Sequence, residues 1–219
     1  MKVLFLAKEK PFTKDVADLI TQHFLDADII IGQADLEFPT KLLKQEFDYT
    51  ISYLSPWIVP KKVLQNTKIA AINFHPGPPE YPGIGCTNFA IYNQEKKFGI
   101  TVHYMHEKVD TGTIIQVKRF PLFEKDTVWS LSQRCYAYIY TTFVGLFKLM
   151  LCAEPFPVSD EKWRRKAYTR VELNELCRIT SDMTSREIQR RIKATTFPNM
   201  PGAFVEIGGE KFEYRDVEN

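Results

Sequence analysis

Apolar runs of strand length alternate with amphipathic segments through the first third of the chain. Within residues 13–24, for example, Val16, Leu19, Ile20 and Phe24 recur at helical spacing. The expected strands are residues 2–7, 28–31, 49–53 and a run that ends at Asn73, and the expected helices are residues 13–24, 40–47 and 60–65. Strands that alternate with helices in this way predict a parallel α/β sheet.

The middle of the chain predicts two more strands and a long helix. Residues 99–105 alternate apolar and polar side chains with period two, and a loop containing Asp110 leads into a strand at 113–118. This pattern suggests an antiparallel pair. Helices are expected at 88–94 and 127–153, the second packing against the sheet. The expected fold is a Rossmann-like, mostly parallel α/β sheet flanked by helices.

Pro155 and Pro157 interrupt the pattern and mark a predicted boundary between residues 1–154 and 155–219. Thr184 and Glu187 have capping-box spacing at the start of a helix that reaches Ala194. Two short strands around Gly208-Gly209 predict a β-hairpin. The second region is therefore expected to be a small α+β appendage containing a β-hairpin.

Composition narrows the possible partners. A formal net charge of +2 on 219 residues is too small to predict electrostatic binding to nucleic acid or to a membrane. Four widely spaced cysteines form no metal-ligand pattern, so no metal is expected. The N-terminal apolar run is short and soon followed by charge, which is unlike a signal peptide and favours a cytoplasmic location.

The strongest chemical signal lies where the strand ending at Asn73 runs into a Pro/Gly-rich loop. Because strand side chains repeat with period two, Asn73 and His75 are expected to point to the same side. In parallel α/β sheets ligands gather outside the carboxyl ends of the strands. Taken singly, each residue also has an ordinary structural explanation. The histidine can be hydrogen-bonded within the structure at the end of a strand, and Asn73 or Asp110 can form a turn. His103 and His106 carry no pattern and are interpreted as structural or exposed.

Considered together, these residues resemble a known family. Four motifs resemble, in order and spacing, those of the folate-dependent formyltransferases. They are Asn73-Phe-His-Pro, the Tyr-Pro-Gly after it, Gly99-Ile-Thr-Val-His and Val109-Asp-Thr-Gly-Thr-Ile-Ile. The resemblance runs through most of residues 1–150. It implies a catalytic trio of Asn73, His75 and Asp110.

The resemblance also implies a formyl donor, 10-formyltetrahydrofolate, and no metal. An amine that attacks a formyl carbon generates an oxyanion that needs a fixed hydrogen-bond donor such as the Asn73 amide. A base near neutral pH such as His75, oriented by a carboxylate, can handle the protons. The residues expected to contact the folate are Pro56, Trp57, Ile58, Lys108 and Asp110.

Departures from the family pattern bear on the acceptor. Residues 7–11 replace the glycine-rich phosphate loop of the purine-pathway enzymes, and a compact tail replaces the basic C-terminal barrel of the transfer-RNA enzymes. The expected acceptor is the amine of a nucleotide-linked amino sugar, specifically a dTDP-linked 4-amino-4,6-dideoxyhexose. The expected substrate contacts are Lys8, Lys10, Phe74, Pro79 and Tyr81. The alternative for the two lysines is an exposed pair that aids solubility, and for Phe74 and Tyr81 core packing is an equal alternative.

A homodimer formed through the appendage is also expected from the family. Two alternatives remain at this stage. One is another amine formyltransferase, acting on glycinamide ribonucleotide or methionyl-tRNA. The other is a non-catalytic module that binds folate or a nucleotide sugar.

Overall fold

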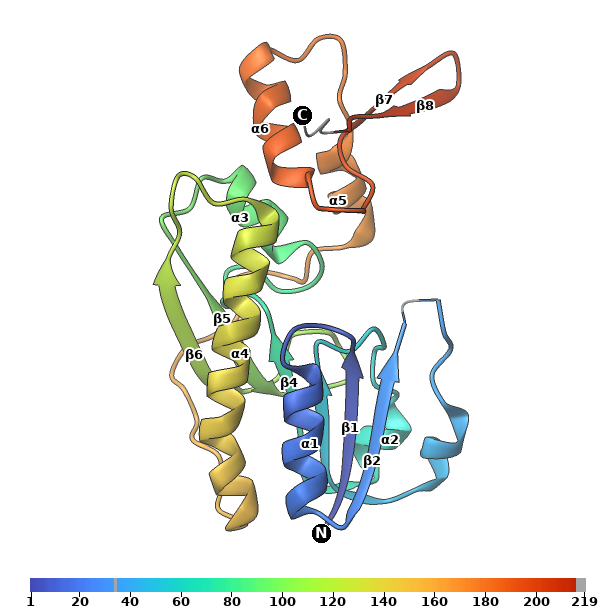
Figure 1. Cartoon of the computed structure of the whole chain (residues 1–219), viewed down its shortest axis with the longest axis vertical. Coiled ribbons are helices and arrows are strands. Elements are labelled where there is room, and N and C mark those ends of the chain that lie inside the picture. Colours follow the sequence, from blue (N-terminus) through green and yellow to red (C-terminus); the bar gives the residue numbers. More distant parts are fainter. Residues whose placement is uncertain (34, 216–219) are drawn as a thin grey trace.

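The computed structural model describes residues 1–33 and 35–215. A six-stranded sheet with helices on both faces forms the larger part, and two helices and a hairpin lie at one end of the molecule (Figure 1). The strands of the large sheet are β1 (Lys2–Lys8), β2 (Asp26–Gly32), β3 (Phe47–Tyr53), β4 (Thr67–His75), β5 (Lys97–Tyr104) and β6 (Ile114–Pro121). Their order is β2-β1-β3-β4-β5-β6.

The first four strands pair in parallel, whereas β5 is antiparallel to both β4 and β6. The prediction of a mostly parallel sheet with an antiparallel pair is therefore confirmed. This topology brings the end of β4 beside the end of β5 and the loop that follows it. Segments that are about 30 residues apart in sequence thus meet at one edge of the sheet.

Helices cover both faces of the sheet. On one face α1 (Thr13–His23) and α4 (Val128–Leu151) bury the main core, in which Val3 and Phe5 belong to the same apolar cluster as side chains of both helices. On the other face η1 (Thr40–Lys44) and α2 (Lys61–Gln65) cover a smaller core around Leu4 and Leu6. Within the described residues, no helix has the length and hydropathy needed to cross a bilayer.

Two helix predictions need correction. The helix expected at 40–47 is a single 3-10 turn that ends at Lys44, because Phe47 pairs with Thr67 and is buried as the first residue of β3. The helix expected at 88–94 is α3 (Cys86–Tyr92), which begins two residues earlier. Its N-cap is Gly85 at φ 70°, a conformation that glycine adopts without strain.

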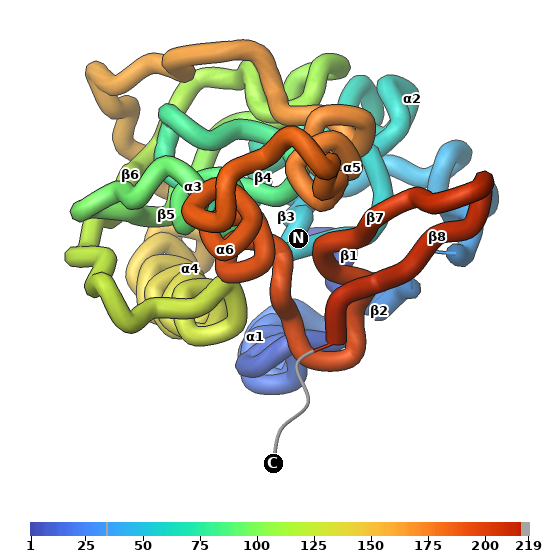
Figure 2. Tube along the Cα trace, turned by 90° about the horizontal axis from the view of Figure 1, so that it is seen from above, coloured from blue at the N-terminus to red at the C-terminus, as the bar shows by residue number. Residues whose placement is uncertain are grey.

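The C-terminal part contains α5 (Arg170–Cys177), α6 (Ser185–Thr195) and a hairpin of β7 (Phe204–Ile207) and β8 (Glu210–Glu213). The hairpin confirms the prediction, and both glycines of its turn have positive φ. The helix α5 has no counterpart in the sequence prediction, although Thr169 and Glu172 form a complete capping box. From above, α6 lies over α3 (Figure 2), where Asn88 Nδ2 donates to the carbonyl of Ala194.

The segment between α4 and α5, residues 152–169, runs back along the sheet past β6 (Figure 1). We call it the return segment. Phe156 is buried against Tyr49 and Tyr104, and the amide of Ser159 donates to the carbonyl of Ile114. A domain boundary at residue 154 stays a prediction, and these contacts attach the first residues beyond it to the large sheet.

Candidate active site

The end of β4 presents two polar side chains to one side of the sheet. Asn73 pairs with His103 across to β5, and His75 pairs with Thr101. Phe74, between them, points to the opposite face and is only 1% exposed in the aromatic core. Period-two geometry thus brings a carboxamide and an imidazole to the same place.

Asp110 reaches this place from the loop between β5 and β6. Its backbone has φ 47°, in the left-handed region that non-glycine residues seldom adopt. Two residues later, Gly112 packs so closely on β5 that a Cβ atom there would lie 1.7 Å from the carbonyl oxygen of Tyr104. The amide of Tyr104 donates to the carbonyl of Thr113, which closes the loop. The tight turn directs Asp110 inward, so that this residue is only 5% exposed.

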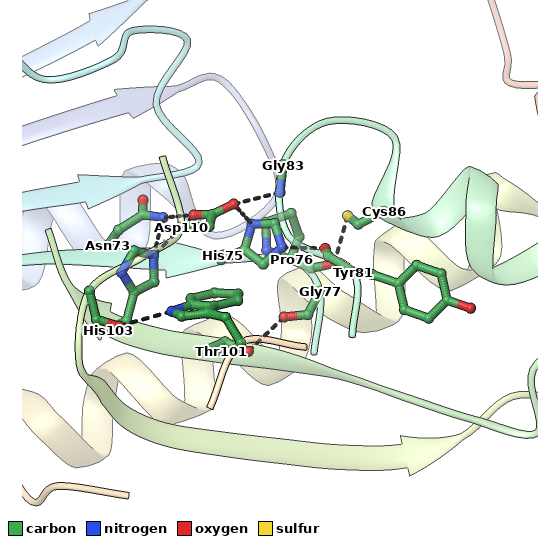
Figure 3. Close-up of polar contacts among 12 residues, drawn as sticks. Asn73, His75, Pro76, Gly77, Tyr81, Gly83, Cys86, Thr101, His103 and Asp110 are labelled. Atoms are coloured by element: carbon green, nitrogen blue, oxygen red, sulfur yellow. Dashed lines mark hydrogen bonds and ion pairs between the residues drawn. The ribbon is translucent and has the colours of Figure 1, made fainter. Parts of the chain in front are cut away.

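The Asp110 carboxylate is the centre of the cluster (Figure 3). One oxygen, Oδ2, lies 3.3 Å from His75 Nδ1 and accepts a 2.6 Å hydrogen bond from the amide of Gly83. The other, Oδ1, lies 3.1 Å from His103 Nε2 and 3.5 Å from Asn73 Nδ2. Asn73 Nδ2 is also 3.0 Å from His103 Nε2. The structure therefore brings Asn73, His75 and Asp110 into direct contact.

The electrostatics of this cluster keep Asp110 ionised. Burial by itself would raise the pKa of its carboxyl group. The charge of His75, the hydrogen bond and charge of His103 and the amide of Gly83 act in the opposite direction, and together they hold the pKa of Asp110 well below its ordinary value. A permanent carboxylate between two imidazoles can orient both rings and stabilise their charged forms.

His75 also has a second partner. Its Nε2 atom lies 2.8 Å from the carbonyl oxygen of Tyr81, so the ring is held between a carbonyl and the carboxylate of Asp110. Gly77 lets the loop pass this close, because a Cβ atom there would lie 2.7 Å from His75 Nε2. Both partners are hydrogen-bond acceptors, and together they hold the imidazole ring from two sides.

Sequence reasoning missed the part played by His103. This residue is 2% exposed and contacts Asn73 and Asp110 directly. Its other ring nitrogen, Nδ1, lies 2.8 Å from the carbonyl oxygen of Tyr104. The available signal was the period-two pattern of residues 99–105, which places His103 on the same face as Thr101, but the register that pairs it with Asn73 is fixed only by the folded sheet.

The structure places two of the expected substrate contacts in the core, the alternative that the sequence left open for both. Phe74 is a core residue, packed against Tyr53 and Phe143. Tyr81 is 5% exposed, its hydroxyl donates to Glu95 Oε1 at 2.6 Å, and its carbonyl contacts His75. Neither ring is free to stack on a ligand in this arrangement. Pro79 is buried next to them in the loop, and its carbonyl accepts from the amide of Arg164.

The expected folate contacts come from two segments, residues 56–58 after β3 and the loop that carries Lys108 and Asp110. Trp57 is half-buried against Gly32 and donates from Nε1 to the carbonyl of Leu36, while the neighbouring Ile58 is 70% exposed. Pro56, on the other side of Trp57, is half-buried. Lys108 is exposed on the Asp110 loop and lines a cleft of about 530 Å³ between that loop and α2. Among the described residues, no hydrogen bond or ion pair joins residues 56–58 to Asp110.

Lys8 and Lys10 lie at the carboxyl end of β1, and both are half-buried. Burial lowers the pKa of Lys10, and the charge of Lys8 lowers it further. Within residues 1–33 and 35–215, neither lysine forms an ion pair with a carboxylate. Lys10 lines a second cleft, of about 620 Å³, whose walls also hold a second lysine, aromatic side chains and two acidic residues: Lys14, Trp129, Tyr136, Phe197, Glu9 and Asp15.

The comparisons with known proteins agree with this geometry. Residues 6–144 match the family model described as formyl transferase. The chain belongs to the formyl transferase family. The resemblance to folate-dependent formyltransferases that the motifs suggested is therefore confirmed.

Curated relatives have different acceptors. A methionyl-tRNA formyltransferase of Fusobacterium nucleatum is 30% identical over 170 residues, covering 74% of this chain and 54% of the relative. A GDP-perosamine N-formyltransferase of Brucella melitensis is 28% identical over 172 residues, covering 78% and 65%. The chain spans about half the length of the methionyl-tRNA formyltransferases that it matches.

Solved structures with the same fold include sugar N-formyltransferases. One from a Shewanella species superposes with a TM-score of 0.77 at 20% identity, covering 98% of this chain and 97% of the other. An N-formyltransferase from Helicobacter canadensis, in complex with folinic acid and dTDP-3-aminofucose, gives 0.73 at 19% identity and covers 95% and 85%. At this level of identity the likeness establishes the fold, which confirms the predicted fold class.

The arrangement is suited to acyl transfer to an amine. It combines an amide donor, two imidazoles and a permanent carboxylate in a largely buried cluster, where hydrogen bonds to a developing charge are strong. In the part of the chain that the structure describes, no three or more His, Cys, Asp or Glu side chains are arranged to hold a metal ion. Proton transfer and oxyanion stabilisation are the chemistry that these residues can supply.

Proposed function

We propose that this chain transfers the formyl group of 10-formyltetrahydrofolate to the amine of a nucleotide-linked amino sugar. The observation that carries the proposal is the convergence of Asn73, His75 and Asp110, with Asp110 Oδ2 3.3 Å from His75 Nδ1 and Asp110 Oδ1 3.5 Å from Asn73 Nδ2. Membership of the formyl transferase family supports the same donor chemistry. Structural neighbours also bind folates, such as folinic acid in the Helicobacter enzyme.

The reaction breaks the bond between the folate nitrogen and the formyl carbon and forms a bond from that carbon to the acceptor nitrogen. As the amine adds, negative charge develops on the formyl oxygen, and we propose that the Asn73 amide donates to it. The amine then loses a proton and the departing folate nitrogen gains one. His75 can carry this proton, because Asp110 orients the ring and stabilises its charged form.

The cleft at the end of β1 supports a nucleotide-linked acceptor. A diphosphate carries negative charge that Lys8 and Lys10 can meet, since neither is engaged by a carboxylate of the described residues. Aromatic walls suit a nucleobase or sugar ring. The Brucella relative acts on a GDP-linked sugar and the Helicobacter neighbour was solved with a dTDP-linked one. We propose a dTDP-linked 4-amino-4,6-dideoxyhexose as the acceptor.

We further propose a homodimer formed through the C-terminal hairpin. Apolar side chains on and next to the two strands are exposed, with Ile207 66%, Phe212 56% and Tyr214 44% exposed. Such a cluster on a short two-stranded sheet is stabilised when a second apolar surface covers it. Sedimentation velocity of the wild type against a double variant, Ile207→Ser with Phe212→Ser, tests this: a wild type that sediments as one chain at all concentrations rules the dimer out.

The function is tested by incubating the protein with 10-formyltetrahydrofolate and a panel of acceptors. The panel contains dTDP-, UDP- and GDP-linked amino sugars, glycinamide ribonucleotide and methionyl-tRNA, and mass spectrometry detects the added formyl group. Formylation of a dTDP-linked 4-amino sugar supports the full proposal. Formylation of only the ribonucleotide or the tRNA would overturn the acceptor while retaining the donor, and formylation of nothing would refute both.

A further inference from the structure

The return segment lies outside the matched family region, yet it contacts both loops that build the site. The amide of Arg164 donates to the carbonyl of Pro79 at 3.0 Å, and the amide of Tyr168 donates to the carbonyl of Pro82 at 2.8 Å. These bonds fix the loop whose members Tyr81 and Gly83 contact His75 and Asp110. On the other side, Trp163 Nε1 donates to the carbonyl of Gly112 at 2.9 Å.

Trp163 also contacts the two histidines themselves. Its ring centroid lies 5.8 Å from that of His75, with an angle of 71° between the planes. The distance to His103 is 5.0 Å and the angle is 89°. Perpendicular packing of this kind is a favoured arrangement of aromatic rings and fixes the orientation of the ring plane. One side chain therefore contacts both imidazoles that flank the carboxylate of Asp110.

We propose that Trp163 is a positioning residue for the transfer reaction. Its indole fixes the ring planes of His75 and His103, and its N–H holds Gly112, two residues after Asp110, against the same side chain. The assignment rests on the proposed function. The consequence is specific: loss of the indole leaves all three members of the trio in place but lets their relative orientation vary, which lowers the rate of the chemical step more than the binding of either substrate.

Loop packing offers no replacement for this side chain. Residues 106–109 of the Asp110 loop are exposed. The loop is held by the Tyr104–Thr113 closure, by a local turn from Thr111 Oγ1 to the carbonyl of Lys108, and by an exposed ion pair between Glu107 and Lys61 of α2. The Trp163 bond thus connects this loop to a segment that is 51 residues away in sequence. Without it, the loop loses its bond to the return segment, and the exposed Glu107–Lys61 ion pair adds little rigidity in its place.

The test compares Trp163→Ala and Trp163→Phe with Phe156→Leu. Phe156 lies in the same return segment and is equally part of its packing, but its aromatic neighbours are Tyr49 and Tyr104 rather than the trio. We expect Trp163→Ala to lower kcat ~10²-fold, with KM for both substrates within about threefold of the wild type. Phenylalanine retains a ring beside the histidines and should recover most of kcat, to within ~10-fold of the wild type. Phe156→Leu should lower Tm and leave kcat within about twofold.

A second readout does not depend on turnover. Hydrogen exchange followed by mass spectrometry should show faster exchange at residues 79–84 and 105–113 in Trp163→Ala, and unchanged exchange in β3. If exchange in both loops matches the wild type, the proposal is overturned whatever the activity. An equal loss of kcat in Phe156→Leu would assign Trp163 a general structural part, and a rise in KM alone would assign it to binding. A wild type with no formyl transfer refutes the proposed function and leaves the exchange result to decide the positioning.

Discussion

The ends of β4 and β1 lie at the same edge of the sheet but differ in how their charges are arranged. At the end of β4, His75 and Asp110 are at most 5% exposed and each has a hydrogen-bonding partner on both sides. At the end of β1, Lys8 and Lys10 are half-buried, and neither pairs with a carboxylate among the described residues.

The two arrangements of charge suit different functions, namely catalysis and the binding of an anionic ligand. A group that stabilises developing charge works best when it is already fixed, because no reorganisation is then needed during the reaction. A group that binds an anionic ligand works best when its charge has no internal partner, because the ligand then supplies it. We interpret the end of β4 as the reaction centre and the end of β1 as the place where the acceptor is held.

Substitution of His75 in the reaction centre should reduce the rate more than any other change. His75→Asn removes the group that can carry the proton, and we expect kcat to fall ~10³-fold while the protein stays folded. His23→Asn is the control, because that ring is exposed on α1 and hydrogen-bonds only to the carbonyl of Leu19. Steady-state kinetics and circular dichroism give the result. A His75→Asn enzyme within threefold of the wild-type rate would remove His75 from the mechanism.

The second prediction concerns stability and pH. Asp110 has a pKa below its ordinary value of about 4, so the stability that it contributes is complete near neutral pH and is lost as the pH falls below ~4. We expect Asp110→Asn to lower the free energy of unfolding by ~3 kcal/mol at pH 7, because two imidazoles and the amide of Gly83 lose their anionic partner.

Urea unfolding of both proteins from pH 7 to pH 3 measures this. The difference between wild type and variant should shrink below pH ~4, because Asp110 then binds a proton in the unfolded wild-type chain while it stays ionised in the folded protein. A difference that stays constant over the whole range would show that the charge of Asp110 does not account for its stabilising effect.

Local pattern was enough to predict one part of the site. The period-two rule placed Asn73 and His75 on one side of a strand, because that geometry depends only on the backbone of the strand itself. The loop position of Asp110 was likewise readable from its turn-forming neighbours. The same rule puts Phe74 on the opposite face, and the structure buries its ring in the aromatic core, although the sequence prediction also counted Phe74 among the substrate contacts.

The rest depends on contacts between distant segments. His103 enters the cluster through its register with Asn73, and neither strand's own pattern contains that register. Trp163 belongs to an irregular segment with no periodicity, and it meets Gly112 only because the return segment folds back over the sheet. Short-range rules describe how a strand presents its side chains, whereas the packing of segments decides which side chains meet.

The lysines at the end of β1 should affect binding of the acceptor rather than the chemical step. Lys8→Gln with Lys10→Gln should raise KM for the nucleotide sugar ~10-fold and change kcat by less than about threefold, because point charges that bind substrate and transition state equally affect KM. The effect should diminish with added salt. Lys68→Gln is the control, since Lys68 pairs with Glu46 on the exposed start of β4. A fall in kcat with unchanged KM would place the lysines in the chemical step.

The smallest effect on rate is expected from Tyr81→Phe. The contact to His75 comes from the main-chain carbonyl of Tyr81, and the phenol ring is buried with its hydroxyl bonded to Glu95 and Asn93. The variant keeps the carbonyl and the ring, so kcat and KM should stay within about twofold of the wild type. Removing the hydroxyl leaves Glu95 without its donor and should lower the free energy of unfolding by ~1–2 kcal/mol.

Kinetics and urea unfolding of the same Tyr81→Phe preparation separate these two consequences. Loss of stability without loss of rate would mean that the Pro/Gly loop acts on His75 through its backbone, and that the phenol only holds the loop in shape. A tenfold fall in kcat or a tenfold rise in KM would instead indicate that the Tyr81 side chain contacts the substrate. The assignment of catalysis to the end of β4 and of acceptor binding to the end of β1 would then be wrong, because the buried residues near β4 would also bind the substrate.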